Sequence, residues 1–148
     1  MGFSRTIVVV VFLLGFGCSR SEGPPSDAEI HQTTGDVLRA TVGKSLKGFR
    51  ILDLQRAEPR KAIVNEIGKT VLIYPIKMRA DMELVDGSPL KEMADKDKTI
   101  LERERRPQEY FFYRIGDKWK YTMHPDIDLK WETKPTAPTF PAEPKHEA

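Results

Sequence analysis

Hydrophobic and polar residues alternate most regularly in residues 70–85, which read TVLIYPIKMRADMELV. Every second residue from Leu72 to Leu84 is apolar or aromatic, whereas the intervening positions become charged from Lys77 onward. Because strand side chains point alternately to opposite faces, this pattern predicts a long strand with one face on a core and the other largely in water. Pro75 lacks the N–H that a β-ladder uses, so we expect an edge position, a bulge or a bend there.

A second alternating pattern predicts a β-hairpin, because residues 110–115 (YFFYRI) and 118–123 (KWKYTM) flank the turn residues Gly116 and Asp117. With a two-residue loop, Arg114 lies opposite Trp119 in this hairpin. One face then carries large side chains, namely Tyr110, Phe112, Trp119, Tyr121 and Met123. Arg114 and Trp119 are placed to form a cation–π pair, and they are our candidate binding residues within the folded domain.

The segment before these strands carries the signals of a helix. Ser26 and Glu29 fit a capping box, in which each side chain accepts a hydrogen bond from the backbone N–H of the other residue. A modest apolar stripe follows, at Ile30, Val37, Leu38 and Val42. Gly35 weakens the middle by about 1 kcal/mol relative to Ala, and Gly43 is expected to end the helix.

Shorter elements are expected in the remaining segments. Residues 50–55 predict a first strand, and residues 62–67 fit either a strand or a turn of helix. Asp86-Gly87 marks a turn, and a short helix is expected around residues 90–94. Residues 99–106 (TILERERR) are interpreted as a charged edge strand in preference to a helical turn, since charges discourage pairing between sheet edges.

Together these elements predict an α+β domain over residues 26–125, with an N-terminal helix packed on a curved antiparallel sheet of four to five strands. The chain has one cysteine, so no intramolecular disulfide can form. A domain of about 100 residues buries enough apolar surface to fold without such a staple.

The first residues of the chain predict export. Arg5 provides a basic start, and an apolar run follows at residues 7–14 (IVVVVFLL). This run is too short for a membrane span but has the length typical of an export signal, so residues 1–17 are predicted to be a signal peptide. The small residues before Cys18 resemble the bacterial lipobox, whose cysteine becomes the lipid-modified N-terminus; ordinary secretion with an incidental cysteine is the alternative. On the lipobox resemblance, Ser19 implies anchorage at the periplasmic face of the outer membrane. Residues 18–25 then form a flexible tether.

The other end of the chain is rich in proline, and residues 126–148 are predicted to be a disordered tail. The prolines recur every third residue, at Pro135, Pro138, Pro141 and Pro144. Because polyproline II has three residues per turn, they would form one ridge of the kind that proline-reading grooves accept, and they are candidate binding residues.

The sequence offers little catalytic or metal-binding chemistry. The net charge is only +2, which gives no electrostatic case for nucleic acid as a partner. The three histidines lie far apart and outside any ligand spacing, and no nucleophile elbow, phosphate loop or dinucleotide motif occurs, so we expect no metal or cofactor. Asp81 and Glu83 share a strand face with Lys77 and Arg79, and are interpreted as a surface charge ladder rather than an acid–base pair.

The combined pattern resembles small envelope lipoproteins of Gram-negative bacteria that carry NTF2-like or cystatin-like domains. The residues that carry the resemblance are 26–38 for the helix, 74–84 for the central strand and 111–121 for the aromatic hairpin. The resemblance implies a sheet wrapped around a helix, with either a filled core or a cone-shaped pocket between them. Related domains with a pocket include isomerases and dehydratases that use Asp and His inside it.

Two functional hypotheses follow. The first is a membrane-anchored, non-enzymatic lipoprotein that binds a protein or peptide of the envelope; the alternative is an NTF2-like pocket enzyme or carrier of a small ligand. A third, an inhibitor of a secreted hydrolase, is neither supported nor opposed. A cavity with a buried carboxylate would favour the second hypothesis. The first is favoured by a filled core made of Leu72, Ile76, Met78, Phe112 and Trp119.

Overall fold

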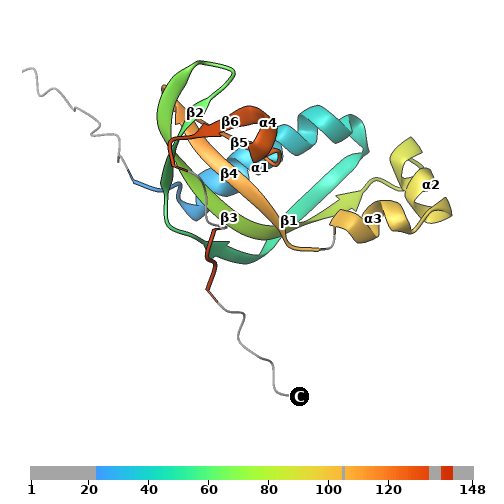
Figure 1. Cartoon of the computed structure of the whole chain (residues 1–148). Helices are drawn as coiled ribbons and strands as arrows, with labels where there is room; N and C mark the ends of the chain where they lie inside the picture. Colours follow the sequence, from blue (N-terminus) through green and yellow to red (C-terminus); the bar gives the residue numbers. More distant parts are fainter. Residues whose placement is uncertain (1–22, 105, 134–137, 142–148) are drawn as a thin grey trace, which may run out of the picture.

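The computed structural model describes residues 23–104, 106–133 and 138–141, except for the side chains of residues 102–104. The signal peptide, Cys18, Pro135 and Pro144 lie outside the described residues. The fold is α+β, with one N-terminal helix against an open antiparallel sheet, which confirms the predicted class (Figure 1).

Six strands form the sheet, one more than the most we expected. They are β1 (Leu46–Arg56), β2 (Arg60–Val64), β3 (Lys69–Leu84), β4 (Gln108–Ile115), β5 (Lys118–Thr122) and β6 (Leu129–Trp131). Their order is β5-β4-β3-β2-β6, and β1 pairs with the second half of β3. The helical segments are α1 (Asp27–Val42), η1 (Gly43–Ser45), α2 (Pro89–Lys96), α3 (Thr99–Glu104) and α4 (Pro125–Asp128).

Pro75 lies where the long strand β3 changes partners. On one side of β3, β1 pairs as far as Ile76 and β2 begins at Ile73. The Pro75 carbonyl accepts a hydrogen bond from the Ala57 N–H, 3.0 Å away, in the gap between β1 and β2. Because the nitrogen and carbonyl of one strand residue face the same side, the missing N–H of Pro75 falls where no ladder bond is lost. The predicted interruption is therefore a split between two partner strands.

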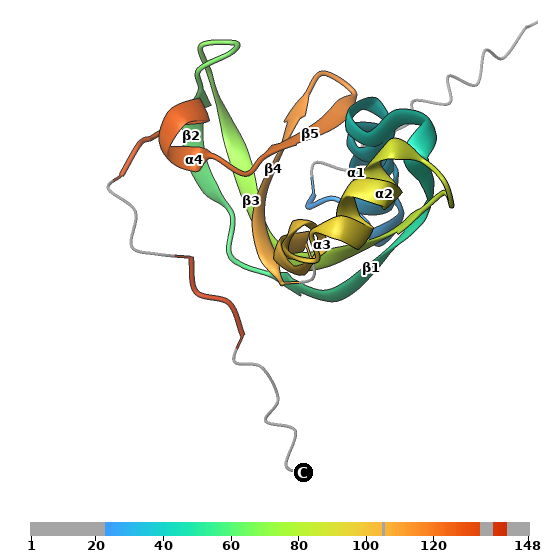
Figure 2. The same ribbon diagram turned by 90° about the vertical axis from the view of Figure 1, so that its right-hand side faces the viewer.

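The sheet is buried on both faces in its middle. The first core lies under α1 and consists of Ile30, Tyr74, Ile76, Met78, Tyr110 and Phe112. The second core lies on the opposite face and consists of Ala62, Val64, Ile73, Phe111, Tyr113 and Leu129. In Figure 2, β2 with α4 and the β4–β5 hairpin diverge as two arms from the base that β3 provides. The second core packs between strands of both arms, so only the part of β3 from Lys77 onward has the wet face that we expected.

Leu72 is a correction to the predicted core. Its side chain is 41% exposed, whereas the next residue, Ile73, is fully buried. Leu72 lies beside Gly23, ahead of the first turn of α1, so the helix leaves it uncovered. Ile73 points to the other face, where β2 and β6 cover it. Burial here follows the position of the covering elements, which the alternation alone cannot show.

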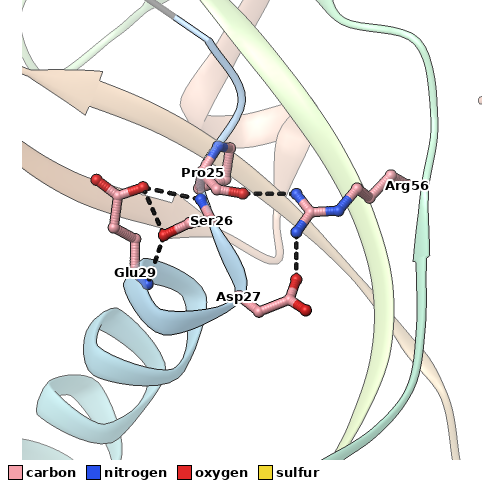
Figure 3. Close-up of polar contacts among 5 residues, drawn as sticks. All are labelled: Pro25, Ser26, Asp27, Glu29 and Arg56. Atoms are coloured by element: carbon pink, nitrogen blue, oxygen red, sulfur yellow. Dashed lines mark hydrogen bonds and ion pairs between the residues drawn. The ribbon is translucent and has the colours of Figure 1, made fainter. Parts of the chain in front are cut away.

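Helix α1 begins and ends as its sequence predicts. The Ser26 and Glu29 side chains form the reciprocal capping box (Figure 3), and Gly43 follows the last helical residue with a φ of 61°. Gly35 has a packing role, because a Cβ at this position would lie 3.0 Å from the Phe49 ring. Because Gly35 has no Cβ, α1 can pack closely against β1, and this packing offsets what Gly35 costs in helix propensity.

Residues 99–106 are a second correction, since α3 replaces the expected edge strand. The Asp97 carboxylate accepts hydrogen bonds from the Thr99 N–H at 3.0 Å and from the Thr99 hydroxyl at 2.6 Å. This local contact satisfies a donor at the start of the helix, and the Glu and Arg residues that follow are good helix formers.

The folded domain also continues past both expected boundaries. Pro25, which we placed in the tether, is fully buried. Beyond residue 125, α4 is held by the Asn65 side chain, which donates to the Ile127 carbonyl at 2.6 Å, and by a hydrogen bond between Thr122 and Asp128. Strand β6 then pairs with β2. The expected tail thus contains the strand that closes one side of the second core.

Met78→Asp tests the first core. Met78 is fully buried, and an unpaired charge there is expected to destabilise the fold by about 3–5 kcal/mol. Met93→Asp is the matched control, because Met93 is 56% exposed on α2 and its replacement should cost no more than about 0.5 kcal/mol. Urea unfolding of the two variants measures both values; equal midpoints would contradict this placement of Met78.

Glu29 makes the start of α1 sensitive to acid. The backbone hydrogen bond from Ser26 is the main cause that holds the pKa of Glu29 below its ordinary value of 4.5. A carboxylate with a depressed pKa stabilises the fold above its unfolded-state pKa, and this contribution disappears as the pH falls through the folded-state value.

We therefore expect Glu29→Gln, which keeps a capping group without the charge, to lower the unfolding free energy by about 0.5–1 kcal/mol near pH 7. The difference should shrink as the pH falls below 4.5 and disappear once the pH is below the depressed folded-state pKa of Glu29. Urea titrations across this range measure the difference, and a difference that persists at acid pH would show that the charge of Glu29 is not its source.

Candidate functional site

The aromatic hairpin has the register that its sequence predicts. Arg114 lies opposite Trp119 and Phe112 opposite Tyr121, and Gly116 supplies the positive φ of the two-residue loop. The Arg114 Cζ is 5.8 Å from the centroid of the Trp119 ring, which confirms the predicted cation–π pair. The five large residues predicted to share one face all belong to the first core or pack against it.

Trp119 joins the hairpin to the rest of the first core. Its ring meets Tyr74 of β3 edge-on, with 5.7 Å between the ring centroids and 75° between their planes. Beside α1, the charge of Arg114 adds to the contact with Ser26 in lowering the pKa of Glu29. The half-buried indole is held in place by its ring contact with Tyr74 and by the guanidinium of Arg114.

One cleft opens beside this residue, and we call it the Trp119 cleft. It has a volume of about 400 Å³. Its walls are Gly23, Val71, Leu72, Tyr74, Arg114, Gly116 and Trp119. Most of this lining is apolar or aromatic, and Arg114 is its cationic side chain, so the cleft suits an apolar group next to an anion.

A second cleft follows the edge of the sheet, and we call it the edge groove. Strand β5 has β4 on one side and no other strand of the described sheet on the other. The groove has a volume of about 410 Å³. It is lined by Thr33, Asp36 and Val37 of α1, by Val64 and Glu66 at the end of β2, by Tyr113, by residues 119–122 of β5 and by Asp128. It therefore runs along β5 between α1 and the β2–α4 arm.

The edge groove is predominantly acidic. Its lining contains the carboxylates of Asp36, Glu66 and Asp128 and one amine, that of Lys120. Lys120 reaches across the groove to Glu66, with 3.2 Å between Nζ and Oε1. Burial, followed by the charges of Glu66 and Asp128, raises the pKa of Tyr113. Arg39 also pairs with Asp36, 3.3 Å away, so three carboxylates face two cations around the groove, and the groove favours cationic groups although the whole chain is slightly basic.

The structure bears differently on the two groups of predicted binding residues, Arg114 with Trp119 and the prolines of the tail. Arg114 and Trp119 come together as expected, and both line the Trp119 cleft. Pro138 and Pro141 lie in a segment without helix or strand, and Pro141 is exposed. The prediction of a ridge that also includes Pro135 and Pro144 falls partly outside the described residues.

Sequence reasoning missed most of the edge groove. Val37, Glu66 and Asp128 come from three segments that are distant along the chain, and each has the local pattern of an ordinary surface residue. The available signal was the hairpin itself, since the second strand of a terminal hairpin is often an edge. Only the return of α4 and β6 beside β2 brings the acidic wall next to β5.

The strand carboxylates form surface ion pairs, as interpreted from the sequence. Asp81 Oδ1 lies 3.2 Å from Arg79 Nε, and Glu83 Oε1 lies 2.7 Å from Lys47 Nζ. Within the described residues, no group of three or more His, Cys, Asp or Glu side chains is arranged to hold a metal ion. In the same part of the chain, no helix has the length and apolar character needed to cross a bilayer.

The architecture defined by these features is an α+β domain with an open sheet edge and two clefts around Trp119. Comparison with protein families, curated proteins and solved structures found no match to this chain.

Proposed function

We propose that this protein is an exported lipoprotein, anchored through Cys18, whose domain binds an extended segment of an envelope protein or peptide by strand addition to β5. The observation that carries the proposal is the open edge of β5 inside the edge groove. A strand edge offers main-chain hydrogen bonds to any extended segment, and neighbouring side-chain contacts supply selectivity.

The hairpin geometry directs a peptide group toward the groove. The residues that flank a two-residue loop, here Ile115 and Lys118, form a hydrogen-bonded pair, and such pairs alternate along antiparallel strands. The next pair, Arg114 and Trp119, therefore does not exchange ladder bonds, and the Trp119 peptide group points away from β4. The five residues of β5 would accommodate a partner segment of about 17 Å.

The walls of the groove indicate the chemistry of the partner. Side chains of an added strand would alternate between two sides. One side meets Val37 on α1, and the other meets the carboxylates of Glu66 and Asp128. A segment that alternates small apolar residues with Lys or Arg fits this arrangement, because its cations would lie against the acidic wall.

The state of the first core also supports binding over pocket chemistry. Ile76, Met78 and Phe112 have exposures of 1% or less, so packed side chains fill the space under α1. Trp119 packs against this core, whereas Leu72 does not belong to it. Among the described residues, the polar residues that are buried as a whole are Thr34 and Thr122, neither of which is a carboxylate. Asp81 has a shielded Oδ1, but this atom lies 3.2 Å from Arg79 Nε in a cleft between β1 and the end of β3, outside the first core.

The location in the proposal rests on the sequence. The apolar run at residues 7–14 and the small residues before Cys18 support lipid attachment, and Ser19 supports the periplasmic face of the outer membrane. An anchored domain meets its partner at a raised local concentration, so that even a short added strand can bind effectively.

Peptides selected from a random display library against the purified protein test strand addition. We expect bound peptides to shift the NMR signals of the β5 amides, and Val37→Trp to weaken binding about tenfold by filling the groove. Val37 is 39% exposed, so the larger side chain has room without disturbing the core. Affinity is measured by isothermal titration calorimetry.

Ala28→Trp is the matched control for that experiment. Ala28 is exposed on α1, nine residues before Val37, which places it on the opposite side of the helix. This variant should bind as the parent does. Selected peptides that shift residues 138–141 instead of β5, or that bind both variants alike, would contradict strand addition at the edge groove.

Lipid attachment is tested separately with labelled palmitate in a bacterial host. We expect the label to enter the parent chain and Ser19→Ala, and to be lost in Cys18→Ala, because Cys18 has the only thiol in the chain. Mass spectrometry of the purified chains identifies the modified residue. Label retained by Cys18→Ala would refute the anchor while leaving the edge groove proposal intact.

A further inference from the structure

The chain enters the folded domain at a fixed point. At the end of β1, Arg56 donates one guanidinium N–H to the Pro25 carbonyl at 2.6 Å and another to the Asp27 carboxylate (Figure 3). Pro25 itself is fully buried. Charge-assisted hydrogen bonds of this kind are the stronger ones in proteins, so residue 25 moves with the sheet rather than with the segment before it.

Chain length limits how far this point can lie from a lipid anchor. Six residues lie between Cys18 and Pro25, and the seven steps of chain from one to the other span at most about 25 Å in any conformation. A folded domain of about 100 residues is roughly 30–35 Å across. The surface around Pro25 is therefore the part of the domain that an anchor at Cys18 holds nearest to the bilayer.

That surface has the composition of a membrane-contacting face, and we call it the Leu72 face. Gly23 lines the Trp119 cleft together with Leu72, Arg114 and Trp119. Lys61 pairs with Leu72 across β2 and β3, so its exposed side chain shares the same face of the sheet. An exposed Leu and a half-buried Trp thus lie beside two cations, next to the point where the chain enters the domain. The two carboxylates at this point, Asp27 and Glu29, are held by Arg56 and by the Ser26 N–H.

From this geometry we infer that the Leu72 face lies against an anionic lipid surface. The inference rests on the proposed lipid anchor. An indole prefers the interface between headgroups and acyl chains, and a nearby Lys or Arg gains about 1 kcal/mol from an anionic leaflet. The carboxylates of Glu66 and Asp128 would be repelled by the same leaflet, so this orientation turns the edge groove toward the aqueous partner.

The lipid-bearing full chain, purified from bacterial membranes, provides the test. It is reconstituted in vesicles of phosphatidylethanolamine and phosphatidylglycerol whose acyl chains carry bromine, which quenches nearby indoles. The two tryptophans report on opposite faces, because Trp119 lines the cleft and Trp131 packs against the second core. Trp131→Phe isolates the emission of Trp119, and Trp119→Phe isolates that of Trp131.

We expect quenching of Trp119 to be at least about twofold stronger than that of Trp131, since interfacial side chains lie about 5–10 Å into the boundary region. In the Trp131→Phe background, Leu72→Glu should reduce the quenching of Trp119 to the level measured for Trp131 in the Trp119→Phe variant. Ile127→Glu is the matched control, since Ile127 is 72% exposed on α4, and it should leave the quenching unchanged. Arg56→Ala should weaken quenching while the protein stays bound, because residue 25 is released.

Flotation of the vesicles separates the two ideas under test. Protein that floats with the vesicles but shows equal quenching of both tryptophans would overturn the orientation and leave the anchor in place. Insensitivity of Trp119 quenching to Leu72→Glu would overturn it as well. Failure of the parent chain to float would refute the anchor, and the inference would be lost with it. Circular dichroism of each variant confirms that the comparison is made on folded protein.

Discussion

The split of hydrogen bonding along β3 is the constraint on which the rest of the structure depends. This one strand pairs with β4 on one side and with both β1 and β2 on the other. The change of partner coincides with Pro75, whose missing N–H costs nothing at the gap. Beyond this point β2 with α4 diverges from the β4–β5 hairpin as the second arm of the sheet, and the second core packs between the two arms, whereas α1 covers the first core on the opposite face.

Both candidate surfaces follow from this arrangement. Helix α1 covers the first face only from its first turn onward, so Leu72 and Trp119 remain at an open cleft beside Gly23. On the second face, α4 and β6 return next to β2, and Asp128 accepts a hydrogen bond from Thr122 where it lines the edge groove beside the end of β5. The hairpin that carries Trp119 lies between these surfaces and has no strand partner on its outer side in the described sheet.

The two surfaces differ in charge, and this difference supports separate roles. Carboxylates dominate the edge groove, whereas Lys61 and Arg114 accompany the apolar residues of the Leu72 face. An anionic bilayer would attract the second surface and repel the first, so a single field would orient the domain and keep the groove accessible to a cationic segment. The Arg56 contacts with Pro25 and Asp27 fix the point where the chain enters the domain relative to both surfaces.

Elements whose signals are short in range can be predicted from the residues alone. These include the capping box of Ser26 and Glu29, the alternation along β3, and the hairpin register that pairs Arg114 with Trp119. Which of the alternating residues are buried depends on the assembled fold, because the covering helix or strand comes from elsewhere in the chain. Ile73 is therefore in a core and Leu72 is not, and the acidic wall of the edge groove comes from segments that meet only after folding. Residues 99–104 form a helix because a contact from Asp97 outweighs the expected role of their charges at an edge.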